Sequence, residues 1–413
     1  MRERVVITGM GVLTPIGNGL EEYRRGLAAG RDGVGEVTAF DGARHRSRRA
    51  AELKGFDPAL HFAPEELPHL SRCTRMVRVA AAEALGAAGL ELDREDRRRI
   101  GVVLGTDLGG MPEAGAGYSG LHYPHRRTRS AGDEPWRSLL LDSFICSQAD
   151  RLAMHYGLRG TTLVVSTACS AGLHALGIGA EMIRLGLADV MLVGGADPLS
   201  EMPQAGFGVL RSLASASIRP FHRHRDGTVL GEAAALVVLE GATHAERRGA
   251  PAWCEIAGYG SSTDAYHMTR PDVTGAGPAR AMAAALEDAG LGPERIGYVK
   301  AHGTATPTND SIEARAIQRV FGEGTRVPVS SVKSMIGHSL GASGAVEAVA
   351  AVLALADGVL PPTLHLDDAD PECDLAHVVE PSPCPGMEAV MANAFGFGGN
   401  NSSMVFRRLP EAA

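Results

Sequence analysis

The stretch TLVVSTACSAGLHALGIGAEMIRLG, residues 162–186, contains the unit from which the fold is built. Its first residues are apolar and largely β-branched, which is typical of a strand. The residues after Cys169 are rich in Ala and Gly at helical spacing and end at Gly186. The same alternation recurs along the chain, beginning with RVVITGMG and LEEYRRGLAAG. This pattern predicts an α/β protein.

The second part of the chain repeats the first. Residues 81–106, AAEALGAAGLELDREDRRRIGVVLGT, resemble residues 281–304, AMAAALEDAGLGPERIGYVKAHGT. In each, a helix ends at Ala-Gly-Leu, a link with acidic residues and Arg follows, and Ile-Gly opens a strand that runs to Gly-Thr. Likewise, LVVSTACSAG and VPVSSVKSMIGHSLGASG both place a strand ending in Val-Ser before a Gly/Ala-rich turn and a helix.

Duplication of one α/β unit explains these matches, and chance similarity of Ala-rich helices is the alternative. The polar stretch THAERRGAP, residues 243–251, is where the two copies would join. We therefore expect an N-terminal half over residues 1–250 and a C-terminal half over residues 251–413.

Cys169 is the candidate nucleophile because it lies where the strand ends and the helix begins. Free N–H groups and the positive end of the helix dipole favour an anion there, so we expect a lowered pKa for its thiol. Its small neighbours leave room for a bulky thioester to approach. The other five cysteines are expected to be inert and buried.

Two histidines and a glycine-rich loop lie at matching places in the second half. His302 and His338 each follow an expected strand and precede a helix, so both should lie near the carboxyl ends of strands, where open sheets build their sites. A structural hydrogen bond is the ordinary role of a lone histidine, but two opposite a helix-capped cysteine favour catalysis. The loop NAFGFGGNN offers backbone N–H groups that can face a developing oxyanion.

Composition excludes several other classes of protein. The formal net charge of −8 argues against a general nucleic-acid binder. Histidines and cysteines show no ligand spacing, so we expect no metal. The chain begins without a signal-peptide pattern, and the apolar residues 340–360 suit a core helix better than a membrane span, which together predict a cytoplasmic protein without a membrane segment. Lysine occurs only at Lys54, Lys300 and Lys333, which hints that these positions need a compact ammonium group.

Seven motifs in order resemble those of the elongating β-ketoacyl-acyl carrier protein synthases of fatty-acid and type II polyketide pathways. They are VVITGMGVLTPIG, STACSAG, PFHRHRDGTVLGE, SSTDAYHMTRP, AHGTATPTND, VKSMIGHSLGASGAVEA and NAFGFGGNN, and they span nearly the whole chain. The resemblance implies a duplicated thiolase-like fold with five layers, α-β-α-β-α. It also implies a decarboxylative condensation of an acyl group on cysteine with a malonyl-carrier thioester.

The resemblance assigns roles to individual residues. Cys169 is implied to be the acyl-accepting nucleophile, with His302 and His338 completing a Cys-His-His set. Lys333 matches a lysine that orders the site, and Glu347 matches its ion-pair partner. The remaining implied residues are grouped by role: Cys169 and Phe397 for the oxyanion hole, Phe397 with Phe395 for gating, and Thr269, Thr304 and Thr306 for the phosphopantetheine arm.

The resemblance also implies partners, and no cofactor beyond the phosphopantetheine arm of an acyl carrier protein. A second subunit is expected, either another copy in a homodimer or a chain-length-factor-like chain in a heterodimer. Because a carrier protein is acidic, local arginines are candidates for docking. They are Arg72, Arg75, Arg78, Arg126, Arg127 and Arg211. Met111 is the candidate for the acyl pocket.

Three other functions compete with a ketosynthase. A non-catalytic chain-length factor lacks the nucleophile, whereas this chain has Cys169 and both histidines. A cysteine acyl hydrolase would need an Asp or Asn that orients its histidine, and would release acid without a malonyl substrate. A thiolase needs a second cysteine as base, and the FGFGG loop contains none. The sequence leaves open the choice between fatty-acid and polyketide or polyene synthesis, with a slight lean toward the latter.

Overall fold

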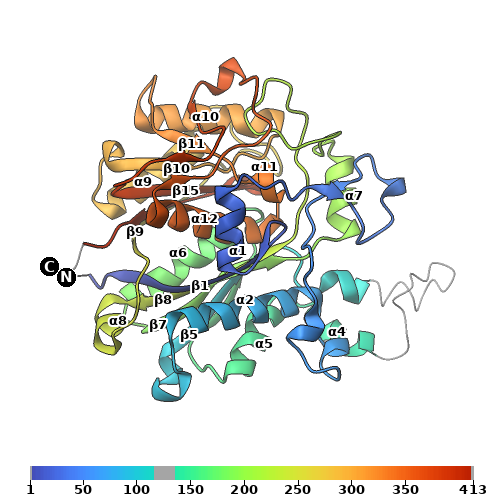
Figure 1. Cartoon of the computed structure of the whole chain (residues 1–413), viewed down its shortest axis with the longest axis vertical. Coiled ribbons are helices and arrows are strands. Elements are labelled where there is room, and N and C mark those ends of the chain that lie inside the picture. The colour runs from blue at the N-terminus through green and yellow to red at the C-terminus, as the bar shows by residue number, and fades with distance from the viewer. Residues whose placement is uncertain (1, 116–134, 411–413) are drawn as a thin grey trace.

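A computed structural model describes residues 2–115 and 135–410 of the chain. Its frame is one 12-stranded hydrogen-bonded sheet that contains two blocks of five main strands, here called the first and the second sheet (Figure 1). The strands of the first sheet are β1 (Val5–Thr14), β5 (Ile100–Gly105), β6 (Thr162–Val165), β7 (Val190–Asp197) and β8 (Ala233–Gly241). They lie in the order β6-β5-β7-β8-β1, with β5 parallel to β6 and β7, and β8 antiparallel to β7 and β1.

The second sheet repeats this arrangement. Its strands are β9 (Cys254–Thr263), β10 (Ile296–Lys300), β11 (Pro328–Ser330), β15 (Ala389–Gly396) and β16 (Asn400–Arg407). The order is β11-β10-β15-β16-β9, with β10 parallel to β11 and β15, and β16 antiparallel to β15 and β9. Numbered within each half, both sheets therefore read 3-2-4-5-1, which is the topology that a duplicated unit would give.

Short strands and one strand pair extend this frame. β13 (Ala376–His377) adds an edge strand to the second sheet, parallel to β11. A short antiparallel contact between β1 and β9 joins the two sheets at their edges. The remaining strands are β2 (Gly17–Asn18), β3 (Gly35–Glu36), β4 (Arg49–Ala50), β12 (Val359–Leu360) and β14 (Ser382–Pro383). The predicted division at residues 250 and 251 falls between α8 (Ala242–Arg248) and β9 and stays a prediction, supported by the repeated strand order.

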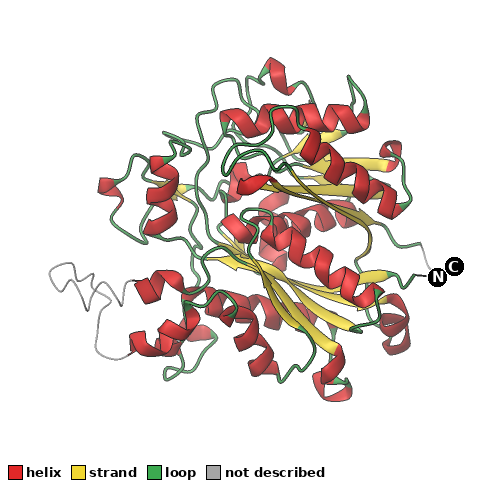
Figure 2. Ribbon diagram, turned by 180° about the vertical axis from the view of Figure 1, so that it is seen from behind, coloured by secondary structure: helices red, strands yellow, loops and turns green. Residues whose placement is uncertain are grey.

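Helices complete five layers (Figures 1 and 2). The outer layer on the first sheet contains α2 (Arg72–Ala88) and α5 (Ser147–Tyr156), and the outer layer on the second contains α9 (Ala276–Ala289) and α10 (Pro307–Phe321). Between the sheets lie α6 (Ala171–Arg184) and α12 (Ser343–Asp357), with α1 (Leu20–Ala28) packed against α12. The α-β-α-β-α fold expected from the resemblance is confirmed. The other helices are α4 (Pro135–Asp142), α7 (Glu201–Val209) and α11 (Lys333–Ile336).

The central helix α12 forms the middle of the hydrophobic core. Its residues from Ser343 to Leu355 are all buried, as expected for a helix that is apolar on every side. The segment Leu340–Asp357 is long and apolar enough to cross a membrane, but 89% of it is buried within the protein. It is a core helix, as the sequence predicted.

Glycines allow the two central helices to touch at their N-terminal ends. A Cβ atom on Gly172 of α6 would lie 2.7 Å from the backbone nitrogen of Ala345, and one on Gly344 of α12 would lie 2.5 Å from that of Leu173. Neither position has room for a side chain. This glycine seam brings the turn before α6, which carries Cys169, against the loop before α12, which carries His338.

Candidate active site

The nucleophile turn lies between β6 and α6. Ala168 adopts a left-handed φ of 52°, which is strained for a residue with a Cβ atom. The hydroxyl of Ser170 donates to the carbonyl of Thr167 at 2.8 Å and closes the turn. Cys169 lies at the tip of the turn and is 5% exposed. Local strain at this residue is typical of a site that is held for chemistry.

His338 lies directly against Cys169. Its Nε2 is 3.0 Å from the sulfur, and its Nδ1 is 2.9 Å from the hydroxyl of Ser343 at the start of α12. Its backbone N–H donates to the carbonyl of Val229 at 2.7 Å, which fixes the loop to the first half. Burial, together with the positive charges of Lys333 and Lys300, holds the pKa of His338 well below its usual value, so the ring is neutral.

His302 lies edge-on to His338, with ring centroids 5.6 Å apart and an angle of 87° between the planes. Its Nδ1 is 3.2 Å from the ammonium of Lys333. An ammonium can only donate, so Nδ1 must accept and the proton of the neutral ring is on Nε2. Burial and the charge of Lys333 hold the pKa of His302 well below its usual value. His302 therefore offers an N–H donor from Nε2.

Lys333 uses all three of its donors inside the protein. Besides His302 Nδ1, it donates to the carbonyl of His302 at 2.7 Å and forms a close ion pair with Glu347. Lys300 lies 2.6 Å from the other oxygen of Glu347. Glu313 accepts the backbone N–H of His302 at 2.7 Å and holds the start of the loop. The structure thus brings together Lys333 and Glu347, which the resemblance paired, with two charged residues, Lys300 and Glu313, that the site prediction missed.

The FGFGG loop closes the other side of the site. The backbone N–H groups of Cys169 and Phe397 lie against the sulfur, where both act to lower the pKa of the thiol. Phe397 stacks on Phe207 of α7 at 5.5 Å between centroids, and Phe395 lies 5.8 Å from the ring of His302. Gly396 has no room for a Cβ atom, which would lie 2.6 Å from the carbonyl of Thr167. The loop therefore packs tightly against the nucleophile turn.

The expected lowering of the thiol pKa is wrong. Burial and the nearby carboxyl of Asp107 raise the pKa of Cys169 to about 12, against the opposing effects of Lys333 and the two N–H groups. The position at the start of a helix favours the thiolate and lowers the pKa of the thiol. Burial disfavours the thiolate and raises this pKa by a larger amount. The resting nucleophile is a thiol beside a neutral imidazole.

A pair of carboxyl groups beside the site was not predicted. Asp197, at the end of β7, accepts from the hydroxyl of Thr106 at 2.8 Å and from the backbone N–H groups of Leu108 and Gly341 at 2.8 and 2.7 Å. Burial and the neighbouring Asp197 raise the pKa of Asp107 to about 8. An acid inside the glycine-rich run GTDLGG was the signal that could have indicated this pair.

The threonines predicted for the phosphopantetheine arm lie in two loops. The hydroxyls of Thr304 and Thr306 are 2.9 Å apart, directly after His302. Thr269 is half-buried and follows Met268, whose carbonyl accepts the N–H of Gly398 at 2.8 Å, so its loop touches the FGFGG loop. Met111 is half-buried and packs on the same buried cluster as Phe207, and its place in the acyl pocket stays a prediction.

The predicted docking arginines do not lie free on the surface as a group. Arg72 pairs with Glu232 at 2.7 Å, Arg75 donates to the carbonyl of Leu67 at 2.6 Å, and Arg78 pairs with Glu66 at 3.1 Å. Each of these guanidinium groups has a partner within the chain, and their assignment to docking stays a prediction. Arg211 is exposed, with no ion pair in the described part of the chain. Arg126 and Arg127 lie outside the described residues.

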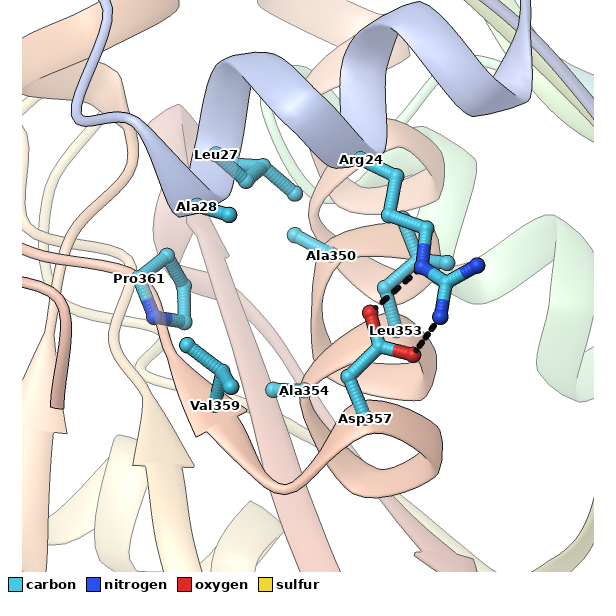
Figure 3. A pocket seen from close by; sticks show the side chains of 9 residues that line it. All are labelled: Arg24, Leu27, Ala28, Ala350, Leu353, Ala354, Asp357, Val359 and Pro361. Carbon is cyan, nitrogen blue, oxygen red and sulfur yellow. Dashed lines mark hydrogen bonds and ion pairs between the residues drawn. The ribbon is translucent and has the colours of Figure 1, made fainter. Parts of the chain in front are cut away.

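A small crevice between α1 and α12 is unrelated to this site (Figure 3). Its volume of about 20 Å³ leaves room for about one water molecule. Arg24 and Asp357 form an ion pair at its rim, at the C-terminal end of α12. The site of Cys169 and His338 lies at the opposite end of that helix.

Known proteins match the chain over its length. The family model "Beta-ketoacyl synthase, N-terminal domain" matches residues 2–245, and "Beta-ketoacyl synthase, C-terminal domain" matches residues 253–367. A 3-oxoacyl-[acyl-carrier-protein] synthase 2 from Vibrio cholerae is 41% identical, over 99% of this chain and 100% of its own.

Two solved structures show the same likeness. The ishigamide ketosynthase/chain length factor matches with a TM-score of 0.92 and 34% identity, covering 99% of this chain and 100% of its own. AntDE:AntF, a type II polyketide synthase acyl-carrier protein in complex with its ketosynthase, matches with a TM-score of 0.87 and 31% identity over the same shares.

Proposed function

We propose, from the premise that this chain belongs to the beta-ketoacyl synthase family and is a condensing acyltransferase like the 3-oxoacyl-[acyl-carrier-protein] synthases, that Cys169 carries the acyl chain. His302 and His338 serve the malonyl half of the reaction. The observation that supports this assignment is the 3.0 Å contact of His338 Nε2 with the sulfur, in a buried site where His302 faces the same space edge-on.

Acyl transfer begins from the protonated thiol. The sulfur of Cys169 attacks the carbonyl carbon of an acyl-carrier thioester as its proton passes to His338 Nε2 at 3.0 Å. The negative charge on the thioester oxygen is met by the N–H groups of Cys169 and Phe397, each worth about 3 kcal/mol in comparable oxyanion holes. The carrier thiolate leaves and takes the proton from His338, which restores the neutral ring.

Condensation follows when a malonyl thioester takes the place of the carrier thiol. The bond to the carboxylate breaks, CO₂ leaves, and its electron pair forms an enolate on the remaining thioester. The Nε2–H of His302 donates to the enolate oxygen, with His338 beside it. The enolate carbon then attacks the acyl group on Cys169, and the cysteine sulfur leaves as a thiolate and takes a proton from solvent. Decarboxylation creates the carbanion, so the site needs no strong base.

The surroundings of the histidines favour this reaction over hydrolysis. His338 Nδ1 is oriented by the hydroxyl of Ser343, and not by the Asp or Asn expected in a cysteine hydrolase. His302 is oriented by a cation, which fixes it as a donor from Nε2. A neutral N–H donor from His302, beside a thiol whose proton His338 accepts, suits acyl transfer followed by enolate stabilisation. Cys169 itself separates the chain from a non-catalytic chain-length factor.

An acyl carrier protein delivers both substrates, and we place its docking site on an arginine surface formed by Arg44, Arg46, Arg48 and Arg211. All four side chains are exposed, and none has an ion pair among the described residues. The loop that carries Arg44, Arg46 and Arg48 packs on α7 (Figure 1). There the side-chain amide of Gln204 donates to the carbonyl of Ser47 at 2.9 Å. Because Phe207 of the same helix stacks on Phe397, the surface lies beside the site. Thr269, Thr304 and Thr306 are assigned to the phosphopantetheine arm inside the entrance.

The second subunit is a chain-length-factor-like chain that pairs along β6. Among the described strands, β6 pairs with β5 alone, and Leu163 at its centre is 41% exposed. An apolar edge strand with a free row of backbone groups is a template for another chain. The likeness to the ishigamide ketosynthase/chain length factor supports this partner, and with it polyketide or polyene synthesis.

The experiment purifies the chain alone and together with its co-expressed neighbours, and identifies the acyl groups on Cys169 by mass spectrometry. We expect loading from an acyl carrier protein, followed by condensation that needs a malonyl-carrier substrate and stops in Cys169→Ala. Acid release without malonyl substrate would instead indicate a hydrolase. A pure self-dimer that elongates ordinary saturated chains would overturn the assignment to a heterodimer.

A further inference from the structure

Lys300 is a buried charge that the proposed reaction leaves without a role. It is the last residue of β10, its side chain is completely buried, and it is one of only three lysines in a chain rich in arginine. Lys333 is equally buried, and the third lysine, Lys54, is exposed. Burying a second ammonium beside the first is costly, so its presence calls for a compensating function.

Lys300 connects the two elements that hold His302. Its ammonium lies 2.6 Å from one oxygen of Glu347, while Lys333 binds the other oxygen. The same ammonium donates to the carbonyl of Ala301, the residue immediately before His302. Lys300 therefore contacts both the carboxylate that positions Lys333 and the backbone that carries the imidazole. The Lys300 side chain is completely buried and contacts these two groups, so we infer that it acts on the reaction through them.

Charge balance gives Lys300 a second effect on the site. Lys333 and Glu347 alone form a neutral pair, and Lys300 adds a positive charge next to both imidazoles. Burial raises the pKa of Glu313 to about 7, so Glu313 offsets only part of this charge at neutral pH. Burial lowers the pKa of Lys300 to about 8, with Glu347 opposing the shift, so the ammonium is largely charged at neutral pH. Its charge is one of those that keep His302 and His338 unprotonated.

We propose that Lys300 is a positioning residue for condensation, which fixes Glu347 and the strand end so that Lys333 stays on His302 Nδ1 and the Nε2–H faces the enolate. This inference rests on the proposed function. A purely structural ion pair is the alternative, since removing one partner of a buried pair destabilises a protein whatever its role. The two explanations differ in which catalytic step changes.

The test replaces Lys300 by Met, which keeps the length without the charge, and by Gln, which keeps a donor. Arg184→Met removes another buried cation, paired with Glu181 and Asp288 far from the site, and is the matched control. Each variant is measured for unfolding free energy, for acyl loading of Cys169, and for the kcat of decarboxylation and condensation against pH.

For Lys300→Met we expect kcat for decarboxylation and condensation to fall about 10- to 100-fold, while loading of Cys169 changes little. The acid limb of the pH profile should move to higher pH, because the imidazoles lose a neighbouring cation that resists their protonation. The titratable groups around the imidazoles are Lys333, Glu347, Glu313, Asp107 and Cys169, and they are unchanged in the variant. Arg184→Met should lower stability alone.

Equal losses in loading and condensation, or an unmoved pH profile in a folded variant, would overturn the inference. If Lys300→Met does not fold, Lys300→Gln carries the same test, and a Gln variant with wild-type rates and profile refutes the role. The proposed function fails separately, if wild-type protein loads no acyl group or if Cys169→Ala still condenses.

Discussion

The two halves of the molecule have the same strand order and opposite chemistry. After the second strand of the sheet in chain order, the first half places Asp107 and the second half places His302; after the third strand, the first places Cys169 and the second Lys333. The first half thus presents an acid and a thiol, and the second presents imidazoles over a cationic cluster. The repeated fold places the ends of two equivalent sheets opposite each other. The residues that follow the strands differ between the halves, so that a thiol on one side faces imidazoles on the other.

The largest expected effect comes from removing the donor of the second half. His302→Ala should lower kcat for condensation about 10²- to 10³-fold, the usual loss for one preorganised donor, with a smaller loss in acyl loading of Cys169. Rapid-quench assays of loading and condensation measure the two steps. His365→Ala, at a half-exposed histidine paired with Asp32, is the control and should match wild type. Equal losses in both steps would contradict the division of labour between the halves.

The next largest effect is expected at Glu240, a buried carboxylate of the first half that stabilises the fold and has no role in the proposed reaction. Burial opposes ionisation of Glu240, but hydrogen bonds from Arg248, His244 and Thr8 outweigh it and lower its pKa from 4.5 to about 2. A group with a lowered folded pKa stabilises above its unfolded pKa, and that stability is lost as the pH falls toward the folded value. Glu240→Gln should therefore lower the folding equilibrium constant about 10²-fold at neutral pH.

Urea unfolding at neutral pH and near pH 3 tests this prediction. The difference between Glu240→Gln and wild type should shrink at the lower pH, and the kcat of the folded variant should stay unchanged. A stability difference that is the same at both pH values would show that packing, and not the ionised carboxylate, is responsible.

A smaller effect tests the acid that faces the thiol. Asp107→Asn removes a negative charge that raises the pKa of Cys169, so the thiolate fraction should rise. Alkylation by iodoacetamide near pH 10, where the Asp107 carboxyl with its pKa of about 8 is ionised in the wild type, should become about tenfold faster, which corresponds to a pKa of the Cys169 thiol lower by one. Asp150→Asn, at an exposed acid on α5, should react at the wild-type rate. An unchanged rate for Asp107→Asn would remove Asp107 from the electrostatics of the site.

The smallest effect is expected at the docking surface. Arg46→Glu should raise KM for the acyl carrier protein about three- to tenfold at low salt and leave kcat unchanged, because a rim charge chiefly steers encounter. Added salt should reduce the difference. Arg94→Glu, at an exposed arginine outside this surface, is the matched control, and an equal change in KM there would refute the location of the surface.

The sequence predicted the fold and the approach of Cys169 to the two histidines, because both follow from the order of strands and helices along the chain. Strand and helix periodicity with an internal repeat indicated two matched units, and the motifs around Cys169, His302 and His338 indicated one site. Charge burial could not be predicted in the same way. The thiol pKa depends on how deeply Cys169 is enclosed, which no local motif encodes, and the expectation taken from the helix terminus alone had the wrong sign.

Other features depend on three-dimensional neighbours. Arg72 follows a cap residue at the start of α2 and looks exposed in the sequence, but the fold places Glu232 beside it. Lys300 drew notice only through the rarity of lysine, since its partner Glu347 is 47 positions away in the chain. Pairings over such distances are set by tertiary packing.

The glycine seam between α6 and α12 limits how this enzyme can be recombined with its relatives. The sulfur comes from one copy of the repeat and both imidazoles from the other, and their spacing is set by two helices in backbone contact at Gly172 and Gly344. A chimaera that takes each half from a different parent inherits a complete set of reactive groups. The sulfur and the imidazoles will be correctly spaced only if both parents have glycine at the positions of Gly172 and Gly344.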